Sequence, residues 1–129
     1  MTLRSLFAAA CAAALAGCAT TAGSTQIAPP ASDAAPTRVL LFSRTAGFRH
    51  ESIPVALDTL RALGMQSGFD VDATEDATRF DDASLSRYAA VVFVSTTREV
   101  LDPAQQATFE RYVAAGGGFM GVHAAADSG

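Results

Sequence analysis

Apolar residues gather into four short stretches after residue 37, and each stretch has the pattern of a β-strand. Val39–Phe42 and Tyr88–Ser95 are apolar almost throughout, which is typical of strands buried on both faces of a parallel sheet. A third such run covers Phe119–His123. Phe69–Thr74 instead alternates apolar and polar residues, and this predicts a strand with one more polar face at the edge of the sheet.

Helical spacing of apolar residues follows the first strand, from Ile53 to Gly68. Pro54 suits the first turn of a helix, where its missing N–H has no partner to lose. Gly68 suits the end, because glycine readily adopts the left-handed conformation that terminates helices. The polar segment Ala77–Arg87 predicts a loop that contains one short helical turn.

A second long helix is predicted to begin at Asp102, the N-cap of a capping box in which Pro103 is the first helical residue and Gln105 the third. Gly116–Gly118 ends this helix. Strands and helical segments therefore alternate along the chain. Right-handed crossovers then give a flavodoxin-like, three-layer α/β fold whose parallel sheet has the strand order 2-1-3-4.

This arrangement leaves the fourth strand as an apolar edge without a crossover helix of its own to cover it. An uncovered apolar edge favours aggregation. We therefore expect residues 38–129 to be the N-terminal part of a larger, truncated domain.

The first residues have the pattern of an export signal. Arg4 is followed by the short apolar run Leu6–Ala16, which is too brief to span a bilayer as a helix. Leu15-Ala16-Gly17-Cys18 resembles a bacterial lipoprotein signal, so we expect residues 1–17 to be removed and Cys18 to carry a lipid. The alternative is an ordinary secretory signal with an incidental cysteine. The Ala-, Thr- and Pro-rich residues 18–37 predict a disordered tether.

These features predict an exported lipoprotein that is anchored on the periplasmic face of the bacterial envelope. The chain has 129 residues, enough for one small domain, and a net charge of -4. All of its basic residues are arginines, and they form no cluster along the sequence. Nucleic acid is therefore not an expected partner, because binding its backbone requires a positive surface.

His50 and His123 are the two histidines of the chain, and both follow predicted strands at the carboxyl edge, where open parallel sheets bind ligands. Their strands lie two positions apart, about 10 Å, so the side chains can approach each other. The pair can serve in general acid–base catalysis, or bind a metal together with Asp127 or Glu51. Alternatively, each imidazole stabilises its own loop through a backbone hydrogen bond. We expect no metal and no cofactor, because the spacing matches no compact ligand motif.

Other polar residues at the same edge are candidates for binding a substrate. The set is Arg44, Arg49, Glu51, Thr97 and Asp127. Two alternatives remain open: one arginine pairs with a loop carboxylate such as Glu75 or Asp76, and Glu51 complements the dipole of the following helix. Phe48 either stacks on a sugar ring or fills the end of the sheet.

Several motifs, in register, resemble those of the ThuA-like domain, a family named after a trehalose-utilisation protein. They are Arg38–Ser52, Thr74–Asp76, the strand from Tyr88 to Thr97, and Gly116–Asp127. The resemblance covers nearly all of residues 38–129. It implies a fold like that of class I glutamine amidotransferases, a role in carbohydrate metabolism with an undefined reaction, and a carbohydrate as the small-molecule partner.

In the amidotransferase relatives, a cysteine nucleophile occupies the tight turn that here carries His123. No cysteine occurs in residues 19–129, so thiol-based amide hydrolysis is excluded. Two hypotheses follow from the resemblance. One is a sugar-handling enzyme domain in which His50 and His123 transfer protons. The other is a non-catalytic, lipid-anchored accessory module that binds carbohydrate.

Overall fold

The structure, a computed structural model, describes residues 35–128. The predicted signal peptide, Cys18 and most of the predicted tether lie outside the described residues. Residues 35–37, the last part of that tether, are exposed and belong to no helix or strand. Within residues 35–128, no helix combines the length and the apolar character needed to cross a membrane.

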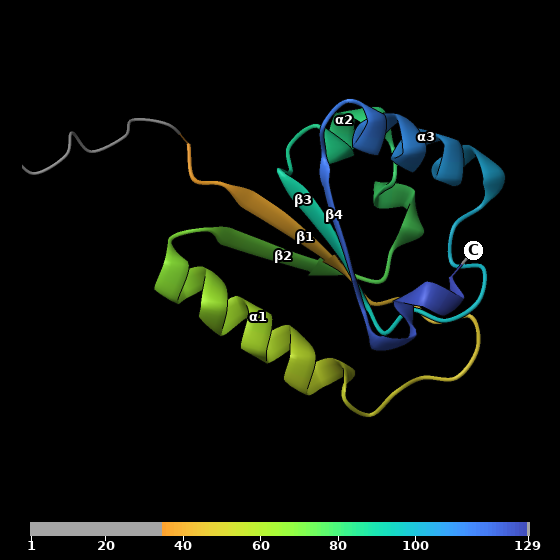
Figure 1. The fold of residues 1–129 in the computed structure, drawn as a ribbon, viewed down its shortest axis with the longest axis horizontal. Coiled ribbons are helices and arrows are strands. Elements are labelled where there is room, and N and C mark those ends of the chain that lie inside the picture. The colour runs from red at the N-terminus through yellow and green to blue at the C-terminus, as the bar shows by residue number, and fades with distance from the viewer. Residues whose placement is uncertain (1–34, 129) are drawn as a thin grey trace, which may run out of the picture. The chain divides into compact units, whose positions relative to one another are not determined.

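Four parallel strands form a single sheet in the order β2-β1-β3-β4 (Figure 1). They are β1 (Arg38–Phe42), β2 (Asp70–Thr74), β3 (Ala90–Val94) and β4 (Gly118–Val122). The predicted sheet and its order are therefore confirmed. The more polar β2 lies at one edge, as its alternating sequence predicts.

Helices cover both faces of the sheet and give three layers (Figure 1). The five helical segments are α1 (Ile53–Ser67), η1 (Ala77–Arg79), α2 (Asp82–Leu85), α3 (Pro103–Ala114) and η2 (His123–Asp127), of which η1 and η2 are 3₁₀ turns. α1 packs on one face, η1, α2 and α3 pack on the opposite face, and η2 lies at the carboxyl ends of the strands (Figure 1).

Successive residues of the central strand β1 point to the two faces, and both are buried. Leu40 and Phe42 face α2 and α3, whereas Leu41 faces α1, and none of the three is more than 1% exposed. Burial of each such side chain stabilises the fold by about 1.5–3 kcal/mol. Phe42 also contacts Phe80 edge-on, with ring centroids 4.7 Å apart. The apolar run of the sequence thus becomes the middle of the core.

The predicted start of α3 and the predicted end of α1 are confirmed, whereas α3 ends at Ala114, ahead of Gly116–Gly118, and Gly118 already begins β4. Asp102 accepts a hydrogen bond from the Gln105 backbone N–H at 2.8 Å, and the Gln105 side chain accepts one from the Asp102 N–H at 2.9 Å. Gly68 ends α1 with a φ of 77°, a conformation that other residues adopt at a cost. Gly64 allows α1 to approach β2, because a Cβ there would lie 2.7 Å from the Phe69 carbonyl oxygen.

One boundary differs from the prediction in a way that affects the site. His123 was expected as the last residue of the fourth strand, but β4 ends at Val122 and His123 begins η2. The backbone of His123 is left-handed, with a φ of 54°, and this turns the chain sharply out of the sheet. Hydrophobic pattern alone does not reveal such a turn.

The segment between β2 and β3 contains two helical turns, η1 and α2, where one was predicted. Each turn has its own aspartate cap, since Asp76 accepts a hydrogen bond from the Thr78 N–H and Asp81 accepts one from the Ser84 N–H. Hydrogen bonds from the side chains of Thr78 and Ser84, and in second place from their backbone N–H groups, hold the pKa of the Asp76 and Asp81 carboxyl groups below the ordinary value.

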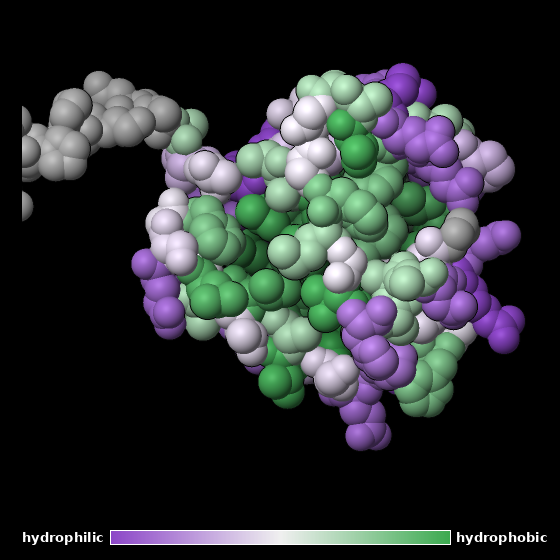
Figure 2. Space-filling model, viewed as in Figure 1, coloured by the Kyte–Doolittle hydropathy of each residue, from purple (hydrophilic) through white to green (hydrophobic). Residues whose placement is uncertain are grey.

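The β4 edge is apolar and open, as the sequence predicts. Phe119 and Met120 are 53% and 56% exposed. Figure 2 shows apolar residues gathered over the middle of this face, where β4 runs in Figure 1.

Candidate functional site

Three segments meet at the carboxyl edge of the sheet: the loop after β1, the loop after β3, and η2 after β4 (Figure 1). Backbone contacts join them. Thr45 and Thr97 form an isolated parallel bridge, and the Ala46 N–H donates to the Thr97 carbonyl oxygen at 3.0 Å. The Arg98 N–H donates to the Asp127 carbonyl oxygen at 3.1 Å. The edge is therefore one connected surface.

The two imidazole rings meet at this edge. Their centroids are 4.5 Å apart with an interplanar angle of 61°, although His50 follows β1 and His123 follows β4, with β3 between these strands. Within residues 35–128, neither imidazole makes a hydrogen bond to the backbone. The structure therefore shows the approach that the topology predicts, and it does not show the alternative in which each ring stabilises its own loop.

The backbone at His123 holds its side chain in place. A non-glycine residue with a positive φ costs about 1–3 kcal/mol, so it persists only where the surrounding structure imposes it. Gly121 permits the turn, because a Cβ there would lie 3.2 Å from the Cβ of Ala125. A strand that turns sharply into a helical segment and exposes a reactive side chain is also the geometry of a nucleophile elbow.

Phe48 lies beside the histidines and is 70% exposed. Its ring meets His50 edge-on, with centroids 4.9 Å apart. The alternative in which the Phe48 ring fills the end of the sheet is therefore excluded. The exposed ring offers an apolar surface next to the imidazole pair.

Thr97 is 4% exposed, and its hydroxyl is occupied by the neighbouring loop. It donates to the Phe48 carbonyl oxygen at 2.9 Å and accepts from the Gly47 N–H at 3.2 Å. In this structure Thr97 holds the segment that leads to His50. The predicted contact between Thr97 and a substrate stays a prediction.

The arginines of the first loop differ in their contacts. Arg49 pairs with Glu75 at 2.6 Å and also reaches the Ser43 carbonyl oxygen, which confirms for Arg49 the alternative of a loop carboxylate. Within the described part of the chain, Arg44 makes no side-chain hydrogen bond or ion pair. Its positive charge contributes to lowering the pKa of Asp76, after the hydrogen bonds from Thr78.

The two predicted acidic residues are exposed on separate segments. Glu51 lies just before α1, whose N-cap residue Ser52 makes no side-chain capping bond. Asp127 ends η2. Among residues 35–128, no three His, Cys, Asp or Glu side chains come together in a group that could hold a metal ion.

A recess of about 630 Å³ opens between the first loop and η2, and it adds residues that the predicted set omits. Its lining is Ala46, Arg98, Glu99 and Asp127. Arg98 and Glu99 follow a buried strand at the carboxyl edge, and this is the signal that identifies Thr97. The same argument therefore predicts Arg98 and Glu99 as site residues from the sequence.

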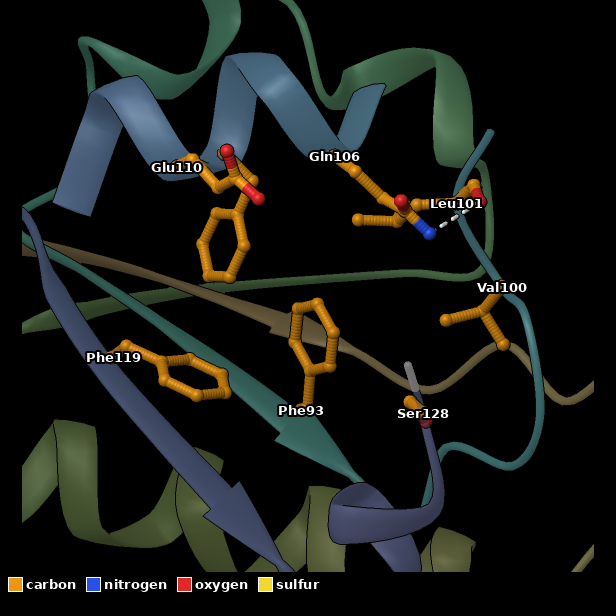
Figure 3. Close-up of a pocket in the computed structure, with 8 residues that line it drawn as sticks. Phe93, Val100, Leu101, Gln106, Glu110, Phe119 and Ser128 are labelled. Carbon is orange, nitrogen blue, oxygen red and sulfur yellow. Dashed lines mark hydrogen bonds between the residues drawn. The ribbon is translucent and has the colours of Figure 1, made fainter. Parts of the chain in front are cut away.

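A second cavity, of about 250 Å³, lies between α3 and strands β3 and β4 (Figure 3). Phe93 and Phe119 point into it from the sheet, Glu110 lies at its α3 side, and Ser128 lies at its lower end (Figure 3). Its lining contains no histidine and is mostly apolar. The carboxyl edge is the candidate site, because the polar and titratable side chains gather there.

Comparison with known proteins agrees with this architecture. The family profile of ThuA, described as trehalose utilisation, matches residues 38–129. A solved ThuA-like protein from Bacteroides uniformis ATCC 8492 superposes with a TM-score of 0.60 at 27% sequence identity. The match covers 77% of this chain and 41% of that protein, so the chain spans less than half the length of its structural relative. No curated protein matches.

The family profile covers the whole of the sheet, the imidazole pair and the loops around it. The chain belongs to the ThuA, or trehalose utilisation, family.

Proposed function

We propose that the carboxyl edge binds a carbohydrate and that His50 and His123 exchange protons with it. The observation that carries this proposal is the contact of the two imidazole rings, with centroids 4.5 Å apart, where two loops meet η2. His123 is exposed there and His50 is half-buried. Histidine is the side chain best suited to take up and release protons near neutral pH. Membership of a family described as trehalose utilisation supports a sugar as the ligand.

Two imidazoles in contact favour complementary roles. An imidazole accepts a proton in its neutral form and donates one in its protonated form, so two rings in contact can divide these two tasks. The neutral ring accepts a proton from a sugar hydroxyl or an activated C–H group, and the protonated ring donates one to an oxygen of the same sugar. Such paired transfer needs no thiol, in keeping with the absence of cysteine from residues 19–129.

Neighbouring residues supply the means to hold a sugar. The exposed ring of Phe48 can stack on the apolar face of a pyranose beside His50. Arg44 and Asp127 offer a donor and an acceptor for hydroxyl groups, with Arg49, Glu51 and Thr97 as the other predicted contacts. The match covers 41% of the structural relative. The activity of a full-length protein of this family is therefore proposed for this chain and is not an observation made on it.

The test is product analysis by NMR after incubation of the full chain with neutral disaccharides, trehalose and its keto-sugar derivatives included. The proposal predicts that His50→Gln and His123→Gln each lower turnover at least about a hundredfold, the lower range for general acid–base catalysis. Arg61→Gln is the matched control, because Arg61 lies on α1, away from the histidines, and pairs with Asp58 on the same helix. Undiminished turnover in both histidine variants would refute the catalytic role. Sugar binding without any turnover would leave the second hypothesis, a carbohydrate-binding accessory module.

We also propose that Cys18 carries a lipid and that the domain is held at a membrane surface by residues 18–37. The support is the sequence pattern of the first residues. The anchor would add membrane as a partner without any spanning helix.

A further inference from the structure

Two recesses lie at the carboxyl edge, and Glu99 lines both of them. The first is lined by Ala46, Arg98, Glu99 and Asp127. The second, of about 510 Å³, lies between Arg44 and the start of α3 and also includes Glu99. Together they form a groove, named here the charged groove and defined by the side chains of Arg44, Glu99, Arg98 and Asp127.

The charged groove carries two positive and two negative side chains that are not paired with one another. Within residues 35–128, none of the four makes a side-chain hydrogen bond or an ion pair. Asp102, a further carboxylate at the second recess, is already used as the N-cap of α3. All four groups are exposed, so each can contact a ligand directly.

Arg98 is held in position by its own backbone and by Gly47. Its φ is 59°, and its side-chain stem lies so close to Gly47 that a Cβ there would be 2.9 Å from the Arg98 Cδ. The same loop continues to His50, and Asp127 ends the turn that begins with His123. The charged groove is therefore built from the segments that carry the imidazole pair.

We propose that the charged groove binds vicinal hydroxyl groups of a neutral sugar and selects against phosphorylated sugars. This inference rests on the proposed function and names the substrate class of the same site. A carboxylate accepts hydrogen bonds from hydroxyl groups and a guanidinium donates to them, so opposite charges side by side suit a diol. Two arginines face Glu99 and Asp127, and Asp102 adds a third negative charge at the second recess. An anionic phosphate therefore gains from the arginines and loses to the carboxylates.

Calorimetry with the full chain tests the assignment through binding alone. Trehalose and glucose are the probes, and Arg98→Gln and Glu99→Gln are the variants. Each is expected to weaken binding about tenfold, the effect of losing one hydrogen bond to a charged group. Arg61→Gln and Glu110→Gln are controls outside the charged groove and should leave the Kd unchanged. Melting curves for all four variants show whether the fold is kept.

A change of charge provides the second arm. The double variant Glu99→Gln/Asp127→Asn leaves two arginines without the opposing carboxylates, so it should bind glucose 6-phosphate about tenfold more tightly than the wild-type chain does. The wild-type chain should prefer glucose to glucose 6-phosphate. The reverse preference would overturn the proposal, as would an unchanged Kd in both the Arg98 and the Glu99 variants or a failure of the wild-type chain to bind any sugar.

The two proposals fail separately. If the histidine variants abolish turnover while the groove variants leave the Kd for sugar unchanged, the proposed function stands and the charged groove is excluded. If sugar binding depends on the charged groove while the histidine variants have full turnover, the groove assignment stands and the catalytic role is excluded.

Discussion

Three residues with strained backbones mark the ends of the strands that bear the site. Ser95, Arg98 and His123 are non-glycine residues with positive φ, and all three lie at the carboxyl edge. Strain of this kind gathers at functional sites, where the surrounding packing over-determines the conformation. At His123 the strained backbone positions the side chain, because the sharp turn brings the imidazole ring into contact with His50.

His123→Gly should therefore be more stable than His123→Ala. Glycine adopts a φ near 54° without steric cost, whereas alanine keeps a penalty of about 1–2 kcal/mol, partly offset by the greater freedom of glycine in the unfolded chain. We expect the free energy of unfolding of the glycine variant to exceed that of the alanine variant by about 1 kcal/mol, measured by urea denaturation. Equal stabilities would contradict the expectation, because the strain at position 123 would then be no larger than the entropic cost of glycine.

Acid sensitivity of the fold can be assigned to single residues. The hydrogen bond from the Ser84 side chain and, in second place, the one from the Ser84 backbone N–H hold the pKa of Asp81 below its ordinary value. A carboxylate with a lowered pKa in the folded state stabilises the fold above its unfolded pKa, and that contribution disappears as the pH falls through the lower, folded value. The stabilising contribution of the Asp81 carboxylate is therefore lost below about pH 4.

Asp81→Asn separates this effect from capping itself. Asparagine is an equally good N-cap, so stability at pH 7 should change little. Urea midpoints between about pH 4 and pH 2 should fall less for the variant than for the wild-type chain, because the variant has no carboxylate at position 81 to be protonated. An identical fall in both proteins would contradict the assignment.

At the scale of elements, the hydrophobic pattern predicted the sheet and its order but not the contacts of the loops. The buried run of β1 and the alternating run of β2 determine which strand is central and which lies at the edge. The order then brings His50 and His123 to one rim, so the pair was predictable. The left-handed turn at His123 has no signal in the hydrophobic pattern. Arg98 and Glu99 can be placed at the carboxyl edge from the sequence, but their arrangement with Arg44 and Asp127 depends on loops that are distant in sequence.

The loop after β1 depends on one buried hydroxyl. Thr97→Val keeps the shape but removes the hydrogen bonds to Gly47 and Phe48 and leaves their backbone groups unsatisfied. We expect a loss of about 1–3 kcal/mol in the free energy of unfolding, measured by urea denaturation. Thr97→Ser retains the hydroxyl and is the matched control. If valine and serine variants were equally stable, the hydroxyl would have no role in holding the loop.

At the scale of the whole molecule, the chain enters the sheet at the end opposite to the site. β1 begins at Arg38, and His50 follows its carboxyl end. We propose that residues 18–37 act as a flexible tether, for which the expected reach is about 25 Å. An anchor at Cys18 would thus hold the domain near a membrane while leaving the imidazole pair accessible.

Cys18→Ser tests this anchor. The variant should move from the membrane fraction to the soluble fraction of an expressing bacterium, because the lipid is attached through the thiol. Its affinity for sugar should not change. A wild-type chain already found in the soluble fraction would favour the ordinary secretory signal.

The central claim is that the two imidazoles act on a sugar as one unit, and a double-mutant cycle on turnover tests it most directly. Residues that act together are strongly non-additive. His50→Gln, His123→Gln and the double variant should therefore all lose about the same factor in kcat/KM. If the double variant instead lost the product of the two single factors, or if either single variant retained full turnover, the contact between the rings would have no part in the chemistry.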